Sequence, residues 1–415
     1  MSTPVRNQQR SADDTLIAVA GWTYFPIAFF ARLPYAMMVV GVMTLVVAAR
    51  GSITLAGLTS ALVGVGAATV GPILGNLADR HGQRPVLLVV GMCNAAFLLA
   101  IAAVAYSALP GWTLPAIAFF VGGTAPQVSP MSRSRLVEII RQKLPKSRLT
   151  RTMSFVMSYE SAVDEIVFVF GPVLVGLLAT LLGAGSPLIA AAILTVAFVS
   201  AFALHPSAGL VQPSKQRSAD SAPIAPMSSI LRLPLILCVI GMTGIGIFFG
   251  STLTSLTSYM ETLGQPDTAG LWYGVLGVGS TILALAIALA PPTFTLRARW
   301  VTFGSIMVAG SLIYALAGNL LFIGVALLVA GIGIGPTLVT LYSLAADIAP
   351  EGRAATVMTI MGSGLIVGQS IASAITGFIA GQLGTAAGMW VPLAAAAIVL
   401  VSGLVSLSTT RYSHA

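Results

Sequence analysis

Long apolar stretches constrain the fold of this chain more than any other feature. Each has at least ~20 residues, the length that a helix needs to cross about 30 Å of hydrocarbon. They lie at about 23–48, 55–78, 85–108, 112–140, 150–182, 186–205, 232–260, 268–290, 298–317, 319–346, 354–383 and 387–408. Of the 415 residues, 57% are hydrophobic and only 8% are charged, which is far from the usage of soluble domains. The sequence therefore predicts a protein of the lipid bilayer.

The secondary structure of these stretches follows from the lack of water in the bilayer. Backbone N–H and C=O groups must find partners inside the protein there, which leaves α-helices or a closed β-barrel. The stretches do not show the short alternation of barrel strands. We predict an all-α polytopic membrane protein with twelve transmembrane helices.

Basic residues indicate how the helices are oriented. Seven surround the connection between the fourth and fifth stretches: Arg133, Arg135, Arg141, Lys143, Lys146, Arg148 and Arg151. Others fall in the remaining even-to-odd connections, whereas Arg50 alone lies on the opposite side. The positive-inside rule then places both termini in the cytoplasm of a multi-pass cytoplasmic-membrane protein. The net charge of +8 thus reflects membrane topology, and we expect no nucleic-acid partner.

The chain divides into two halves at a polar segment rich in Pro and Ser, which is typical of a linker. Glycines of the second stretch, Gly57, Gly64 and Gly66, recur 213 positions later as Gly270, Gly277 and Gly279 of the eighth. This repetition favours two pseudo-symmetric six-helix bundles. We predict a cytoplasmic segment over 1–22, a bundle over 23–205, the linker over 206–229, a second bundle over 230–408 and a tail over 409–415.

A compact charged motif, Gly75-Asn-Leu-Ala-Asp79-Arg80-His-Gly82-Gln-Arg84, joins the second and third stretches. It resembles the loop signature G-x-L-x-D-R-x-G-R-[KR] of the major facilitator superfamily, with Gln83 as the departure. The resemblance extends over essentially the whole chain and implies an alternating-access transporter. It implies a cytoplasmic gate at Gly75, Asp79, Arg80, Gly82 and Arg84, with Asp79 near the N-terminus of the eleventh helix. A polar turn that only fixes topology is the alternative.

The fifth stretch also resembles one branch of that superfamily. Phe170-Gly171-Pro172-Val-Leu-Val-Gly176 is similar to the G-P-x-x-G-G element of drug/proton antiporters, although Val175-Gly176 replaces its final glycine pair. The resemblance implies export driven by protons.

Three acids in the fifth stretch are the candidate proton-coupling residues: Glu160, Asp164 and Glu165. An unpaired charge at the bilayer centre costs at least ~2.5 kcal/mol. Glu160 and Asp164 share a helix face, whereas Glu165 is rotated by about 100° from Asp164. Arg32 is the only basic residue that we place deep inside a stretch, so two acids would need protons or other partners. A purely structural pair between Arg32 and one carboxylate is the alternative.

The substrate site is harder to predict, because a sequence does not give helix rotation. Superfamily architecture implies a cavity along the first, fourth, seventh and tenth helices. Candidates there are Tyr35, Met38, Gln127, Phe248, Phe249 and Tyr342, and for each of them packing is the more ordinary explanation. Such a cavity favours a small neutral, zwitterionic or cationic amphipathic molecule.

We predict that the chain is not an enzyme and binds no metal or cofactor, with the proton gradient as energy source. The three histidines fall in loops or the tail, and no HExxH, GxSxG or phosphate-binding loop occurs. The predicted function is proton-coupled export of a small molecule by alternating access, performed by a monomer. A symporter or facilitator that imports a small metabolite is the alternative, and a non-transporting sensor or scaffold is a more remote one.

Overall fold

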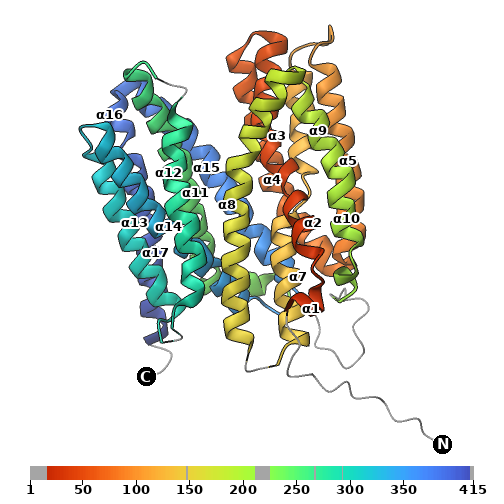
Figure 1. Ribbon diagram of the computed structural model, residues 1–415, viewed down its shortest axis with the longest axis vertical. Coiled ribbons are helices and arrows are strands. Elements are labelled where there is room, and N and C mark those ends of the chain that lie inside the picture. Colours follow the sequence, from red (N-terminus) through yellow and green to blue (C-terminus); the bar gives the residue numbers. More distant parts are fainter. Residues whose placement is uncertain (1–15, 146–147, 211–224, 266–267, 292, 412–415) are drawn as a thin grey trace, which may run out of the picture.

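The computed structural model describes residues 16–145, 148–210, 225–265, 268–291 and 293–411, and its regular elements there are helical. Parts of the sequence prediction lie outside the described residues, namely the segment up to residue 15, Lys146, linker residues 211–224 and residues 412–415. Figure 1 shows two helical bundles side by side, which we call the N-terminal half (up to residue 210) and the C-terminal half (from residue 225). This arrangement confirms the predicted all-α, two-bundle fold.

The N-terminal half is built from α1 (Leu16–Ala20), α2 (Tyr24–Phe30), α3 (Leu33–Arg50), α4 (Ile53–His81), α5 (Gln83–Val104), α6 (Thr113–Gly123), α7 (Val128–Lys143), α8 (Leu149–Leu182), α9 (Ser186–Leu194), the π-helix η2 (Thr195–Val199), α10 (Ser200–Leu204) and the 3₁₀ turn η3 (Pro206–Leu210). The C-terminal half is built from η5 (Met227–Leu231), α11 (Leu233–Thr262), α12 (Ala269–Ala286), η7 (Ile287–Leu289), α13 (Leu296–Ala315), α14 (Leu320–Ile348), α15 (Ala354–Leu383), α16 (Thr385–Gly388) and α17 (Val391–Arg411).

Ten helical segments of the described chain are long and apolar enough to cross a membrane. The predicted fourth and ninth stretches are not among them. The ninth is α13, which begins with Arg297 and Arg299. The fourth is not one helix, because α6 ends at Gly123 and α7 begins only at Val128. Pro126 in this break has no backbone N–H to donate, and α7 itself is polar.

The first predicted stretch is also interrupted near its middle. The helical segment α2 ends at Phe30 and α3 begins at Leu33, with Arg32 as its N-cap and Pro34 in its first turn. Proline at this position fits a helix start, because the N–H that it lacks has no partner inside the helix. The two breaks place Arg32 and Gln127 beside irregular backbone in the interior of the N-terminal half.

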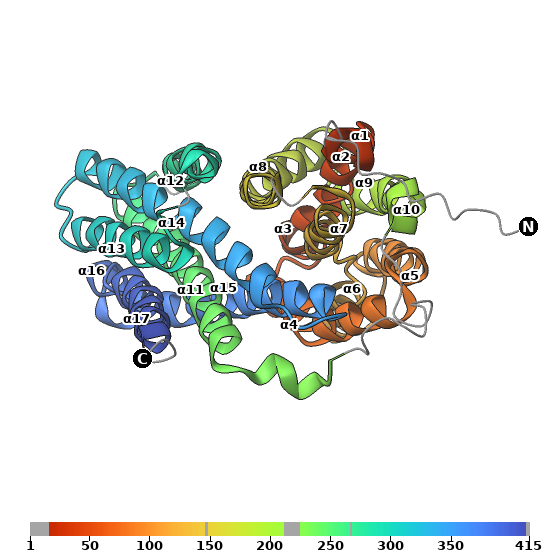
Figure 2. The same cartoon turned by 90° about the horizontal axis from the view of Figure 1, so that it is seen from below.

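The two halves meet near the end of the molecule where α4 and α7 end and α15 begins. We call this the basic end, and it lies at the bottom of Figure 1, where the ribbons of the halves approach each other. There α4 packs against α15, and α8 packs against α12 and α14 (Figure 2). Three glycines of α4, Gly64, Gly71 and Gly75, face the hydroxyl groups of Ser370, Ser363 and Thr359 on α15.

Packing inside the N-terminal half relies on backbone contact between α4 and α6. A Cβ atom at Gly122 would lie 1.8 Å from the backbone oxygen of Val63, and one at Gly66 would lie 2.1 Å from that of Phe119. No side chain fits such distances without a shift of one helix. The glycines therefore allow α4 and α6 to pack closely.

We predict that Gly122→Ala destabilises the protein by about 1–3 kcal/mol, as expected for overpacking. The measurement is the thermal unfolding midpoint of the purified protein in detergent. Gly57→Ala is the matched control, because a Cβ at Gly57 of α4 meets nothing within 4 Å and alanine is the better helix former. Equal midpoints for the two variants would contradict this account of the packing.

Candidate functional site

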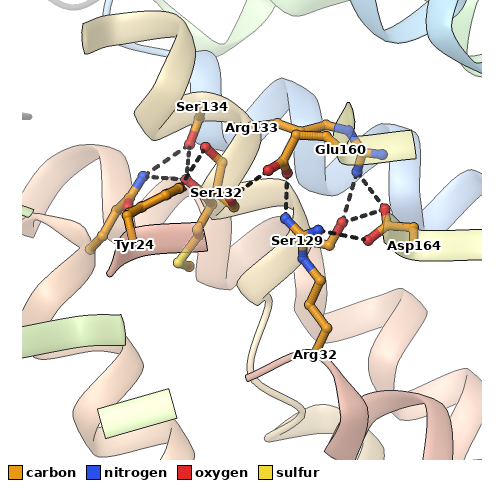
Figure 3. A network of polar contacts seen from close by, with 10 residues as sticks. Tyr24, Arg32, Ser129, Ser132, Arg133, Ser134, Glu160 and Asp164 are labelled. Carbon is orange, nitrogen blue, oxygen red and sulfur yellow. Dashed lines mark hydrogen bonds and ion pairs between the residues drawn. The ribbon is translucent and has the colours of Figure 1, made fainter. Parts of the chain in front are cut away.

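A buried network of charges lies in the middle of the N-terminal half, where α3 begins and where α7 and α8 run side by side (Figure 3). Arg32 donates a hydrogen bond to Glu160 of α8, and both side chains are buried. Its other terminal nitrogen, Nη1, lies 3.6 Å from Oδ1 of Asp164. The break between α2 and α3 thus presents one guanidinium to two carboxylates that are one helical turn apart.

Arg133 of α7 supplies a second cation to this network. Its Nη1 lies 2.8 Å from Oδ2 of Asp164 and donates to Oγ of Ser129 at 2.7 Å. Ser129 in turn donates to Asp164 at 2.6 Å. The side chain of Arg133 is only 1% exposed.

The position of Arg133 corrects two predictions from the sequence. Arg133 and Arg135 are buried in the interior and do not lie in a cytoplasmic connection, so Arg32 is not the only deep basic residue. The cause is the break before Val128, because α7 starts inside the bundle and carries both arginines within its first turns. A hydropathy reading that continued one helix from 112 to 140 could not show this.

Glu160 is held by uncharged groups as well as by Arg32. Oγ of Ser132 donates to its Oε1 at 2.9 Å, and the hydroxyl of Tyr24 lies 2.7 Å from the same Oγ. Glu160 is completely buried, whereas the side chain of Asp164 is 18% exposed. Asp164 is therefore the most accessible charged group of this network.

The charges of the network balance, since two guanidinium groups face two carboxylates. The two acids that Arg32 was not expected to neutralise thus have other partners in the structure, and for Asp164 that partner is Arg133. Glu165 points elsewhere and accepts hydrogen bonds from Ser280 and Thr281 of α12, in the other half. Asp164 and Glu165 are adjacent in the sequence, but their side chains are rotated by about 100° around the helix axis. They therefore contact different partners.

The candidate substrate residues fall into two groups. Tyr342 of α14 lies under the guanidinium of Arg133, 3.8 Å from its carbon to the ring centre, and the half-buried Tyr35 is close enough to interact electrostatically with Tyr342 and Asp164. Gln127 is buried and donates to the carbonyl of Ala125 at 3.1 Å. By contrast, Met38, Phe248 and Phe249 lie in or against the hydrophobic cores, as Tyr342 and Tyr35 also do, but make none of these contacts with the charged network. In this conformation those three are packing residues.

The charged motif at the end of α4 forms most of the polar contact between the halves at the basic end. Asp79 accepts hydrogen bonds from the backbone N–H groups of Ala355 and Thr356, at 3.0 and 2.8 Å, and from the Thr356 hydroxyl at 2.6 Å. These residues are the first turn of α15, where free N–H groups and the helix dipole favour an anion. Arg353 donates to Asn76 at 2.6 Å beside them.

The glycines of the motif have separate structural reasons. A Cβ at Gly75 would lie 2.2 Å from the Thr359 hydroxyl, so glycine lets α4 approach α15. Gly82 is the single residue between α4 and α5. Its φ of +91° lies in a region of backbone conformation that favours glycine. Arg80 and Arg84 have exposed side chains.

Gln83, which departs from the superfamily signature, belongs to a second buried cluster that the sequence did not reveal. Its amide donates to Ser134 Oγ at 2.9 Å and accepts from Nε of Arg135 at 2.9 Å. Arg135 also donates to Ser207 at 3.3 Å, and Ser207 contacts Nδ1 of His205 at 2.9 Å. Burial and then the charge of Arg135 hold the pKa of His205 below its ordinary value.

Among the described residues, no group of three His, Cys, Asp or Glu side chains is placed to hold a metal ion. The centre of the N-terminal half brings together two carboxyl groups, two guanidinium groups and the ring of Tyr342. Arginine keeps its proton in such surroundings, so the carboxyl groups are the members of the network that can ordinarily titrate.

We predict that Asp79→Asn weakens the closure of the basic end, because the amide replaces a charge-assisted acceptor whose bonds are worth about 1.5–3 kcal/mol each. The measurement is the alkylation rate of a single cysteine introduced by Ser363→Cys, with Cys93→Ser and Cys238→Ala as background. The rate should rise roughly tenfold for each 1.4 kcal/mol lost. Ser363 is buried and faces Gly71.

Glu351→Gln is the matched control for this experiment, because Glu351 is an exposed acid in the turn before α15. Its removal should leave the alkylation rate unchanged. Equal rates for Asp79→Asn and Glu351→Gln would rule out Asp79 as a gate residue.

Comparison with known proteins agrees with this architecture. No curated protein sequence matches the chain. Solved structures match it at TM-scores of 0.69 for the human organic anion transporter MFSD10 (TETRAN), 0.73 for a bacterial homologue of the iron transporter ferroportin in an outward-facing state, and 0.65 for the E. coli fucose:proton symporter. The MFSD10 structure is 17% identical to this chain, and the match covers 95% of this chain and 100% of that one. The ferroportin homologue is 15% identical, with 93% of this chain and 99% of that one covered. The fucose:proton symporter is 15% identical, with 92% of this chain and 98% of that one covered.

Identities this low show a shared fold and say nothing of cargo. The family model of the Major Facilitator Superfamily, however, matches residues 24–364, which is most of the chain. The match includes α2, the charged network, the motif around Asp79 and the start of α15. With its two helical bundles and its transporter neighbours, the chain belongs to the major facilitator superfamily of secondary transporters.

Proposed function

We propose that the chain is a proton-coupled exporter of a small neutral, zwitterionic or cationic amphipathic molecule, of the drug/proton antiporter type. The observation that supports this best is the exposure of Asp164. It is 18% exposed, while Arg32, Arg133 and Glu160 around it are at most 3% exposed. A proton or a cationic ligand that reaches the centre therefore meets a carboxylate first.

Competition at this carboxylate accounts for the coupling. A proton on Asp164 removes the charge that attracts a cationic group, and a bound cationic group disfavours the proton. Proton and substrate then occupy the site alternately, which is the requirement for antiport. Because Arg32 and Arg133 keep their charge, one anion must stay nearby in the protonated state.

Glu160 fits the role of that permanent anion. It is buried under Arg32 and receives a further hydrogen bond from Ser132. An unpaired buried charge is costly, so the ion pair with Arg32 stabilises both partners while Asp164 changes its protonation.

The walls near Asp164 suit an amphipathic ligand. Tyr35 and Tyr342 offer aromatic faces, and aromatic faces attract cations as well as apolar groups. Arg133 lies over Tyr342 while it also contacts Asp164, so a ligand cation can occupy that face of the ring only if Arg133 moves. Alternating access would bring this site to either side of the membrane in turn, with the contacts of Asp79 closing the basic end.

The remaining assignments are part of the same proposal. We place the protein in the cytoplasmic membrane with both termini and the basic end in the cytoplasm, because the positive-inside rule favours that orientation. It acts as a monomer that needs the proton gradient and no cofactor, and it carries out no catalysis. With protons entering the cell, antiport at Asp164 would move the substrate outward.

We predict that Asp164→Asn abolishes proton-driven transport, because the amide cannot exchange a proton. Proteoliposomes with an acidic interior and a fluorescent amphipathic cation outside provide the assay. The pH gradient should accelerate uptake of the probe by the unmodified protein. In the variant, this acceleration should be less than about a tenth as large. A tenfold decrease corresponds to a loss of about 1.4 kcal/mol in coupling. Glu261→Gln is the control, since Glu261 is an exposed acid at the opposite end of α11.

Full gradient-driven uptake by Asp164→Asn would rule out its coupling role. Uptake that instead requires an acidic exterior, so that proton and probe move in the same direction, would favour the importing symporter.

A further inference from the structure

Glu165 lies at the contact between the two halves and does not take part in the charged network. Its Oε1 accepts a hydrogen bond from Ser280, and its Oε2 accepts one from Thr281 at 2.8 Å. Ser280 is 1% exposed. In the described part of the chain, these two bonds are the polar side-chain contacts between α8 and the C-terminal half.

From this placement we infer that Glu165 is the residue whose protonation is linked to the opening of the interface between α8 and α12. Protonation of Glu165 would then control the opening of the interface between α8 and α12. Protonation of its neighbour Asp164 would compete with substrate binding. The inference rests on the proposed function for what this gate does in transport, but the link between protonation and opening can hold without it.

No cation compensates Glu165 within the described residues. The arginines of the network are paired with Glu160 and Asp164, and Glu165 forms no ion pair. The charged and titratable groups around the middle of α8 are Tyr159, Glu160 and Asp164 of the same helix, Arg32 and Tyr35 at the start of α3, Arg133 of α7, Tyr273 of α12 and Tyr342 of α14. The neighbouring elements α9 and η7 carry none. Asp164 adds repulsion to a charge on Glu165.

The surroundings of Glu165 depend on the conformation. While α8 and α12 are in contact, the side chain of Glu165 is half-buried and its carboxyl group bonds to the hydroxyl donors of Ser280 and Thr281. When these helices separate, water can solvate the carboxylate. Removal from water disfavours the charged form of an acid more than the neutral form.

Linkage makes this relation reciprocal. If closing the basic end favours the neutral acid, protonation favours the closed basic end by the same free energy. A proton taken up while the opposite end is open would thus be released when the basic end opens. This order moves protons toward the basic end, as the proposed antiport requires.

The inference can be tested without any substrate. Spin labels at Lys143→Cys and Leu289→Cys, which are exposed positions at the basic end of different halves, report the separation of the halves by pulsed electron paramagnetic resonance. Cys93→Ser and Cys238→Ala remove the native thiols. The labelled full-length protein is measured in lipid nanodiscs between pH 5 and pH 9.

We expect the closed population to grow as the pH falls. In Glu165→Gln the distance distribution should stay closed and lose its pH dependence, because the neutral amide can still bond to Ser280 and Thr281. The Ser280→Ala/Thr281→Val double variant keeps the acid, so its distribution should still change with pH. This second variant separates the titration of Glu165 from a purely structural bridge.

Three results would overturn the inference: a pH-independent distribution in the otherwise unmodified labelled protein, an unchanged pH dependence in Glu165→Gln, or a closed population that shrinks as the pH falls. Asp164→Asn should retain the pH-dependent change. If proton-driven transport is absent even in the unmodified protein while this change persists, the proposed function fails and the inference about Glu165 stands.

Discussion

Burial of charge in a membrane protein constrains this structure more than any other interaction. Two guanidinium groups and two carboxylates share the interior of the N-terminal half, where each unpaired charge would cost several kcal/mol. The interruptions at Arg32 and before Val128 are the local structures that bring both arginines to α8. Hydroxyl groups of Ser129 and Ser132 add one hydrogen bond to each carboxylate, to Asp164 and to Glu160 respectively. Proton exchange at one member of this set necessarily changes the balance of all the others.

The two halves share a fold but differ in chemistry. Aligning Met157 of α8 with Met361 of α15 places Glu160 and Asp164 opposite Gly364 and Gly368. A Cβ at Gly368 would lie 2.3 Å from the backbone oxygen of Thr243, so in the C-terminal half these positions allow α15 to pack closely against α11. The C-terminal half instead receives contacts from the other half: the N-terminus of α15 binds Asp79, and hydroxyl groups of α12 bind Glu165. In these contacts the acids therefore lie in the N-terminal half, and the groups that donate hydrogen bonds to them lie in the C-terminal half.

The sequence was sufficient for the parts of the structure that depend on periodicity and composition. Apolar length predicted the helices and the two bundles, and helical spacing separated Glu165 from the face shared by Glu160 and Asp164. The sequence could not place Arg133, because a continuous hydropathy reading hides the break at Pro126 and assigns polar residues of α7 to a loop. The partners of Glu165 were equally inaccessible, since Ser280 and Thr281 lie on a helix more than a hundred positions away. Gln83 looked like a defect in a motif, although its amide binds a buried arginine.

The central claim is that buried carboxyl groups of α8 exchange protons with one side of the membrane. Charge displacement after a pH step tests it most directly, measured on substrate-free proteoliposomes adsorbed to a solid-supported membrane. The unmodified protein should give a transient current that saturates with the size of the step. A variant with both Asp164→Asn and Glu165→Gln should give only the current of protein-free liposomes. A current of equal size in that double variant would contradict the account.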